Sequence, residues 1–328
     1  LYANNASKTI EHKNDGKSIY IKSIPMQWPL DNVPGECSFE VWIRLEGATA
    51  QVKCRINNNR SDKTQYPARM QELPAVYTNG PFWRLMTYSG DQPFTGGELT
   101  QVPPKFMWSG YRTTENWSAL VNDDDWGLGL WQPGIFEATG GFFGETGVGG
   151  SDSPNTGYFA PLAREILDNN IRYEYRYTLI LGSVAEIREY VYEYSARPKP
   201  PMYVFRDSRC HWYFNNARDD GWPVRGELVV KPLGDNPQLL GPTDFWYAKD
   251  AGKLTVDAAC SDDVALLRVF WKCFSDKGFS AEKSVEIPVV ADNQYHEYEI
   301  DLARVPEYSG VITALRVDPD LKPEAAAR

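Results

Sequence analysis

Residues 38–56 read SFEVWIRLEGATAQVKCRI, and they decide the fold class of this chain. Apolar and polar side chains alternate along residues 38–45 and again along residues 49–56. This alternation is the period of a β-strand that buries one face. The Glu46-Gly47 step between the two runs is typical of a tight turn. The stretch therefore predicts an antiparallel hairpin and indicates a protein built mainly from sheets.

The same alternation continues along the chain, in NWSALV (116–121), GLGLWQP (127–133) and NIRYEYRYTLIL (170–181). The third run has two distinct faces. One face carries Ile171, Tyr173, Tyr175, Tyr177 and Leu179, and the other carries Arg172, Glu174, Arg176 and Thr178. We expect an antiparallel sheet whose polar face is solvated or lines a groove.

Two helices interrupt the strands. Ser183 and Glu186 form a capping box at the start of residues 183–194, which predicts a helix there, and a second short helix is expected at 161–167. The proline-rich stretch ARPKPPM (196–202) reads as a linker. We therefore predict an all-β chain in two modules, a large antiparallel β-sandwich over residues 1–195 and a smaller jelly-roll β-sandwich over residues 203–328.

Composition excludes some classes of partner. The 328 residues include 34 basic and 44 acidic side chains, for a net charge of −10. Such a balance repels phosphate backbones, so we expect no nucleic acid. No apolar run is long enough for a membrane span. The five cysteines form no CxxC pair, so no metal site is predicted, although Cys37 and Cys54 could form a disulfide across the predicted hairpin.

The stretch from Trp108 to Gly150 is rich in tryptophan, carboxylates and glycine. Flat aromatic rings cover the apolar face of a sugar, while carboxylates and amides bind its hydroxyl groups. The stretch therefore suggests a polysaccharide or oligosaccharide partner. The alternative is that the tryptophans are core residues. The residues that we assign to substrate binding are Trp108, Trp117, Trp126, Trp131, Asp125 and Arg112.

A glycoside hydrolase normally needs two carboxyl groups, one as acid and one as nucleophile or base. Glu72 in MQELPAVY and Glu115 in TENWSALV each open an apolar strand beside aromatic residues, so they form our candidate catalytic pair. The alternative for each is a structural carboxylate that bonds a neighbouring loop or forms an ion pair with Arg69 or Arg112. Asp91 is a weaker candidate because its Ser-Gly-Asp setting indicates a turn.

Two other functions stay open. An eliminating lyase would use tyrosine as its base, because none of the three histidines lies in the aromatic region. Four arginines could then hold a uronate: Arg84, Arg112, Arg172 and Arg176. In a non-catalytic glycan-binding protein, the same aromatic side chains would only hold sugar.

The C-terminal block FRDSRCHWYFNNARDDGWPVRGELVV, followed by YHEYEIDLARVPEYSGVITALRVDP, resembles the jelly-roll modules of secreted bacterial carbohydrate-active enzymes. This resemblance implies a galactose-binding-like jelly roll with a sugar-binding role. It also implies that a structural calcium ion is possible, while no cofactor is required.

The N-terminal stretch EVWIRLEGATAQVKCRINNNRSDKTQYPARMQELPAVYTNG resembles the large antiparallel sandwiches of galactose-mutarotase-like proteins. Such sandwiches occur in polysaccharide-degrading enzymes as catalytic and as accessory domains. Together the two resemblances imply a carbohydrate-active protein that is secreted, periplasmic or on the cell surface. A shared fold does not by itself fix the activity.

Overall fold

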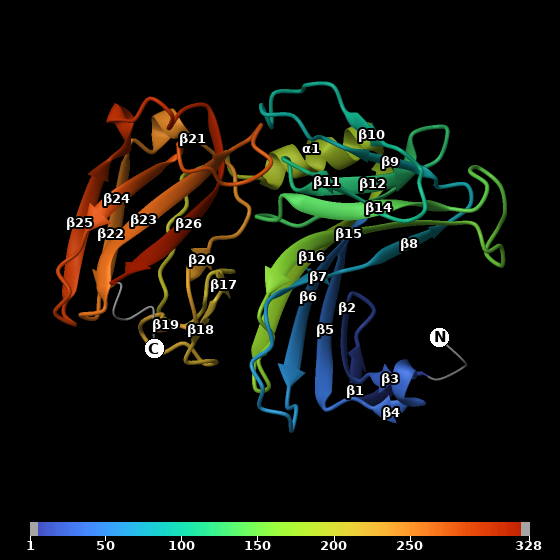
Figure 1. Ribbon diagram of the computed structural model, residues 1–328. Coiled ribbons are helices and arrows are strands. Elements are labelled where there is room, and N and C mark those ends of the chain that lie inside the picture. The colour runs from blue at the N-terminus through green and yellow to red at the C-terminus, as the bar shows by residue number, and fades with distance from the viewer. Residues whose placement is uncertain (1–5, 323–328) are drawn as a thin grey trace. The chain divides into compact units, whose positions relative to one another are not determined.

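The computed structural model describes residues 6–322, and its contacts divide the chain into two compact units (Figure 1). Unit 1 comprises Leu1–Tyr66, Met70–Ala163 and Leu167–Ala196, and unit 2 comprises Pro67–Arg69, Arg164–Ile166 and Arg197–Arg328. The main boundary lies at the start of the predicted linker, and residues 196–202 contain no helix or strand. Both units are built from antiparallel sheets, so the prediction of an all-β fold is confirmed.

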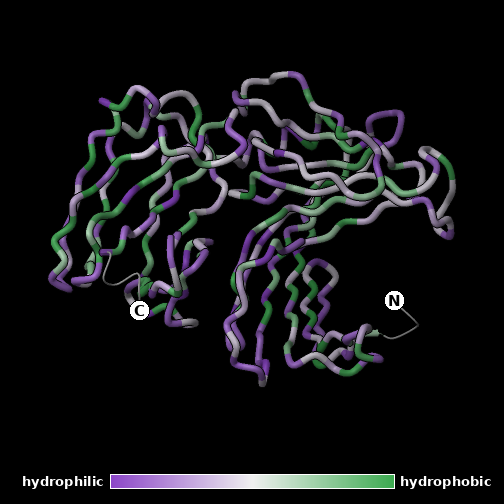
Figure 2. The backbone as a smooth tube through the Cα atoms, viewed as in Figure 1, coloured by the Kyte–Doolittle hydropathy of each residue, from purple (hydrophilic) through white to green (hydrophobic). Residues whose placement is uncertain are grey.

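A nine-stranded antiparallel sheet forms the larger layer of unit 1. Its strands, in spatial order, are β1 (Lys8–Asn14), β2 (Ser18–Ile24), β5 (Cys37–Glu46), β6 (Thr49–Asn58), β16 (Arg172–Ser183), β13 (Trp126–Trp131), β12 (Trp117–Val121), β9 (Arg84–Thr87) and β10 (Thr100–Val102). In Figure 2, hydrophilic and hydrophobic segments alternate along these strands, as expected for a sheet with two different faces.

The predicted hairpin is strands β5 and β6 of this sheet. Glu46 pairs with Thr49, and Gly47 has a φ of 57°, which is the left-handed conformation that a tight turn requires. Cys37 lies opposite Asn58, while Cys54 lies opposite Val41. The two cysteines are therefore four positions apart along the ladder, about 14 Å, which is too far for a disulfide. All five cysteines are free.

A second sheet packs on the first and completes the sandwich. Its strands are β11 (Ser109–Arg112), β14 (Glu137–Phe143), β15 (Thr156–Glu165) and β7 (Arg69–Glu72), and β8 (Val76–Asn79) pairs with β15. The core between the layers includes Leu85, Leu120 and Leu130 from the nine-stranded sheet, together with Val76 and Phe159 from the second sheet.

The predicted helix at residues 161–167 is wrong, because Pro161 lies inside strand β15. Ala160 and Pro161 pair with Thr139 and Ala138 of β14. Local helix propensity is weak compared with the burial and sheet pairing that this segment gains from its neighbours. A short hairpin, β3 (Met26–Gln27) with β4 (Val33–Pro34), lies beside the short 3-10 helix η2 (Trp28–Leu30).

The other predicted helix is confirmed as α1 (Val184–Tyr194). The Ser183 hydroxyl accepts a hydrogen bond from the backbone N–H of Glu186, whose carboxylate in turn accepts the backbone N–H of Ser183. Val184, Ile187 and Val191 form its buried side. They pack onto strands β12, β13 and β16, so α1 covers part of one face of the nine-stranded sheet.

Replacing Ser183 with alanine removes the side chain that caps α1. We expect Ser183→Ala to lower the free energy of unfolding of unit 1 by about 1 kcal/mol. Denaturant unfolding followed by circular dichroism measures this difference. Ser183→Asp, which restores a capping side chain, serves as the control and is expected to unfold like the unmodified protein. An equal loss of stability in both variants would show that the capping hydrogen bond does not stabilise unit 1.

Unit 2 contains a six-stranded sheet made of β17 (Tyr213–Asn215), β20 (Gln238–Leu240), β26 (Val311–Leu321), β23 (Val264–Cys273), β24 (Ser284–Pro288) and β21 (Trp246–Tyr247). Two ladders and two 3-10 helices accompany it: β22 (Lys253–Ala259) with β25 (Tyr295–Asp301), β18 (Ala217–Asp219) with β19 (Val230–Pro232), η3 (Ala248–Asp250) and η4 (Leu302–Arg304). Val256 and Ile300 pack against Leu267 and Val269, so β22 and β25 form a second layer on this sheet.

Candidate functional site

A groove of about 900 Å³ lies on one face of the nine-stranded sheet in unit 1. Its floor comes from strands β1, β2, β5, β6, β16 and β13, and helix α1 contributes to its lining. The aromatic side chains that face the groove are Tyr20, Trp42, Trp131, Tyr190 and Tyr194, whereas the ring of Tyr177 packs in the core on the other side of the sheet. The basic side chains are Lys13, Arg44, Lys53 and Arg176, and Asp15 is the acidic residue of the lining.

The strand register explains why these side chains meet. Residues two apart along a strand share a face, and directly paired residues on neighbouring strands share it too. One set of paired positions runs across five strands and is called the first row here: Lys13, Tyr20, Trp42, Lys53 and Arg176. The neighbouring set is the second row: Ser18, Arg44, Gln51, Thr178 and Trp131.

A third row on the same face consists of Glu11, Lys22, Glu40, Arg55 and Glu174, so it has three acidic and two basic residues. Arg55 lies between Glu40 and Glu174, with Nη2 at 2.5 Å from Glu174 Oε1 and Nη1 at 3.6 Å from Glu40 Oε1. Hydrogen bonding from Lys53 and Arg55 lowers the pKa of Glu174, against the effect of burial. Burial raises the pKa of Glu40, but hydrogen bonds from Asn57 and Tyr20 outweigh it and lower that pKa overall. Both carboxyl groups are therefore ionised.

Aromatic side chains approach each other at two places in the groove. The rings of Tyr20 and Trp42 lie 5.2 Å apart between centroids. On α1, the rings of Tyr190 and Tyr194 lie 4.5 Å apart, and Tyr190 meets Trp131 edge-on at 6.2 Å. The groove therefore has one aromatic pair on the sheet and an aromatic cluster where α1 meets strand β13.

Helix α1 can approach β13 closely because Gly129 has no side chain. A Cβ atom at Gly129 would lie 2.6 Å from Cγ2 of Ile187. Ile187 has no exposed surface, and it packs with Ile180 and Trp117 under the helix. The position of Tyr190 and Tyr194 at the groove thus depends on this helix–sheet contact.

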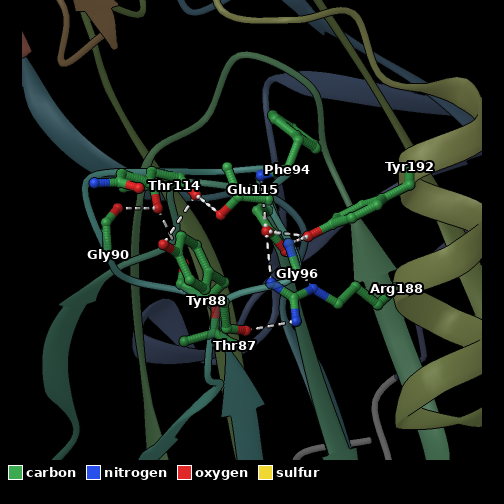
Figure 3. A network of polar contacts seen from close by, with 12 residues as sticks. Thr87, Tyr88, Gly90, Phe94, Gly96, Thr114, Glu115, Arg188 and Tyr192 are labelled. Carbon is green, nitrogen blue, oxygen red and sulfur yellow. Dashed lines mark hydrogen bonds and ion pairs between the residues drawn. The ribbon is translucent and has the colours of Figure 1, made fainter.

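Glu115 lies in a buried network beneath α1, away from the groove lining (Figure 3). Its Oε1 atom accepts hydrogen bonds from Arg188 Nη2 at 2.8 Å, Tyr192 Oη at 2.7 Å and the backbone N–H of Phe94 at 3.0 Å. Its Oε2 atom accepts from Arg188 Nε and from Trp117 Nε1, each at 3.0 Å. Burial and the bond to Glu115 raise the pKa of Tyr192.

Glu72 lies on another element than Glu115, which is part of the turn between β11 and β12. It ends strand β7 of the second sheet and accepts a hydrogen bond from the Tyr158 hydroxyl. Burial and this contact raise the pKa of Tyr158. Because Glu115 has no exposed surface and protein donors occupy both of its oxygens, it cannot contact a saccharide. The prediction that Glu72 and Glu115 form an acid/base pair is corrected for this reason.

The four predicted tryptophans do not form one cluster. Trp117 is 1% exposed and belongs to the core under α1. Trp108 stacks on Tyr158, with ring centroids 4.9 Å apart, at the second sheet. Trp126 is exposed and lies 6.2 Å from the Phe82 ring. Of the four, Trp131 alone lines the groove.

The two polar residues assigned to substrate also lie elsewhere. Asp125 is an exposed turn residue with a φ of 59°, and it forms an ion pair with Arg84 at 2.6 Å. Arg112 ends strand β11, where it lies opposite Glu137. Neither belongs to the groove lining. The two-faced pattern of residues 170–181, by contrast, correctly indicates a groove-lining face, since Arg176 and Thr178 belong to the lining.

In unit 2, Trp212 is 6% exposed and Trp246 is 2% exposed, so both are core residues. Among residues 6–322, no group of three or more His, Cys, Asp or Glu side chains is arranged to hold a metal ion. Within the same range, no helix is long and apolar enough to cross a membrane.

No protein-family model and no curated protein matches the sequence. Solved structures similar to it include a galactose mutarotase-like protein from Lactobacillus casei, with 12% identity over 53% of this chain and 72% of that one, at a TM-score of 0.34. A galactose mutarotase related enzyme from Lactobacillus acidophilus shows 11% identity over 55% and 72% of the two chains, at a TM-score of 0.35.

A Paenibacillus xanthan lyase is similar over 98% of this chain, with 9% identity and a TM-score of 0.33. The present chain spans 30% of the length of that lyase. Two of these structures are of galactose mutarotase-like or related proteins, the class that the N-terminal sequence resembles.

Proposed function

We propose that unit 1 binds a saccharide chain in the groove of the nine-stranded sheet. The observation that carries this proposal is the convergence of five aromatic side chains on one groove of about 900 Å³. This volume lies within the range of about 300–1,000 Å³ that is usual for ligand sites. The aromatic rings offer flat apolar surface for the C–H faces of sugar rings. Gln51 and Thr178 on the floor can exchange hydrogen bonds with hydroxyl groups.

The dimensions of the groove favour a chain of sugars over a single sugar. Its floor crosses six strands, from β1 to β13. Five inter-strand spacings of about 4.8 Å give a length of roughly 24 Å. Strand β1 is an edge strand with exposed side chains throughout. A polymer can therefore continue past this end of the groove.

We favour saccharide binding over glycoside hydrolysis, which is the more specific function that the sequence predicts. A hydrolase of the usual kind needs one protonated carboxyl group to donate to the leaving oxygen. The pKa values of Glu40 and Glu174, two carboxyl groups of the third row, are both lowered. They could act as bases but not as that acid. The Tyr-based lyase, the other catalytic alternative, would place a groove tyrosine beside a uronate.

Trp42 is the aromatic residue at the centre of the first row, so its removal is the sharpest test of the groove. We expect Trp42→Ala to lower the affinity for a bound polysaccharide by about tenfold, equivalent to about 1.4 kcal/mol. Retardation in polysaccharide gels identifies the ligand from a panel of plant, algal and microbial polymers. Titration calorimetry with oligosaccharides of that ligand then measures the affinity.

The matched control is Trp126→Ala, which removes an exposed tryptophan of the same sheet outside the groove. It is expected to bind as the unmodified protein does. A loss for Trp126→Ala with none for Trp42→Ala would refute the groove and return the site to the predicted tryptophan cluster. Assays for new reducing ends and for unsaturated uronates, run on the same panel, would detect hydrolysis or elimination.

A further inference from the structure

The basic side chains of the groove differ in how closely carboxylates approach them. Lys53 Nζ lies 2.8 Å from Glu174, Lys13 Nζ lies 3.0 Å from Glu11, and Arg44 has a loose contact of 3.9 Å with Glu46. Arg176 is exposed and has no ion-pair partner within residues 6–322. The groove therefore contains one guanidinium group whose charge no neighbouring carboxylate neutralises.

The distribution of charge on this face runs against the composition of the chain. Acidic residues outnumber basic residues by 44 to 34 overall. The first and second rows nevertheless contain four basic residues and no acidic one, while Glu11, Glu40 and Glu174 lie in the third row. Asp15, the acidic residue of the lining, accepts backbone N–H groups of Lys17 and Ser18 in a turn.

The register also sets two positive charges directly opposite each other, because Arg176 of β16 pairs with Lys53 of β6. Like charges at paired positions destabilise a sheet. Glu174 offsets the charge of Lys53, so the guanidinium group of Arg176 is the cation that a bound anion would neutralise.

The chemistry of arginine adds a second indication. A guanidinium group can only donate hydrogen bonds. Its natural partner is a group rich in acceptor oxygens, and the planar fork of arginine matches a carboxylate or sulfate in two parallel bonds.

We propose that the saccharide bound in the groove is anionic, and that a carboxylate or sulfate group of one sugar is held by Arg176 beside Lys53. This inference rests on the proposed function, since it names the class of saccharide that the groove takes. It also assigns the position of the negative group within the groove. Trp42 and Tyr20 then cover the sugars that follow along the first row.

The experiment measures binding of the full chain to three polymers: polygalacturonate, a sulfated galactan and a neutral galactan. We expect one of the two anionic polymers to bind, with affinity that falls as salt rises from 50 to 200 mM because added ions screen the charges. Arg176→Gln should weaken that binding by about tenfold. Whether polygalacturonate or the sulfated polymer is retained distinguishes a carboxylate from a sulfate ligand.

The control is Arg172→Gln, which removes an exposed arginine from the same face of β16 but outside the groove lining. It is expected to bind as the unmodified protein does. Arg176→Lys, which keeps the charge but loses the planar fork, should show an intermediate affinity. Circular dichroism of each variant separates a folding defect from a binding defect.

Several results would overturn the inference. Equal losses for Arg172→Gln and Arg176→Gln would mean that only the general surface charge matters. Binding of the neutral galactan alone, weakened by Trp42→Ala but not by Arg176→Gln, would refute the anionic ligand and leave the proposed function intact. Binding of no polymer from this set or from the wider panel would refute the proposed function itself.

Discussion

Glu115→Gln is expected to lower the free energy of unfolding of unit 1 by about 3–5 kcal/mol, because it leaves a buried cation unpaired. Arg188 would keep its position under α1, where its side chain is 14% exposed, but its carboxylate partner would be gone. For a unit of this size the melting temperature should fall by roughly 10 °C. Differential scanning calorimetry of the full chain measures this change.

Glu189→Gln is the matched control for this prediction, because Glu189 is an exposed glutamate on the same helix. Its substitution should leave the melting temperature nearly unchanged. A Glu115→Gln variant that melts normally, but has lost a measurable turnover of polysaccharide, would contradict the structural role. The catalytic role that the sequence suggests for Glu115 would then be restored.

Ile187→Ala is expected to cost about 2–5 kcal/mol of stability, since it removes a fully buried side chain and leaves a cavity. The contact between Ile187 and Gly129 fixes α1 on the sheet, so the same change should loosen Tyr190 and Tyr194 at the groove. We therefore expect weaker saccharide binding as well as lower stability. Denaturant unfolding and titration calorimetry measure the two effects on one protein sample.

Ile187→Val provides the matched control, because it removes one methylene group and should cost only about 0.5–1.5 kcal/mol. Binding by this variant should be close to normal. If Ile187→Ala loses stability but binds saccharide with full affinity, the helix supports the fold without forming part of the site.

The local elements of this fold were accessible from the sequence. Alternation and a glycine turn predict the β5–β6 hairpin, and the Ser183–Glu186 pair predicts the start of α1. The helix predicted at residues 161–167 fails because long-range pairing with β14 determines that segment. Such pairing joins residues far apart in the chain, and no local pattern records it.

The site was harder to predict for the same reason. Lys53 and Arg176 meet because β6 pairs with β16, which follows more than a hundred residues later. The tryptophans of residues 108–131 are close in sequence, but hairpins and alternating faces send them to different parts of unit 1. For Glu115 the apolar setting correctly indicates burial, whereas its partners on α1 leave no sign near it in the sequence.

The register of the groove strands also spaces the ligand-facing side chains regularly. Neighbouring side chains on this face lie about 4.8 Å apart across the strands and about 6.8 Å apart along them. Ligand preference can therefore be redesigned by substituting one of these positions at a time, at a known distance from the others. The strand register itself is fixed, because a shift by one residue would turn core side chains into the groove and unfold the sheet.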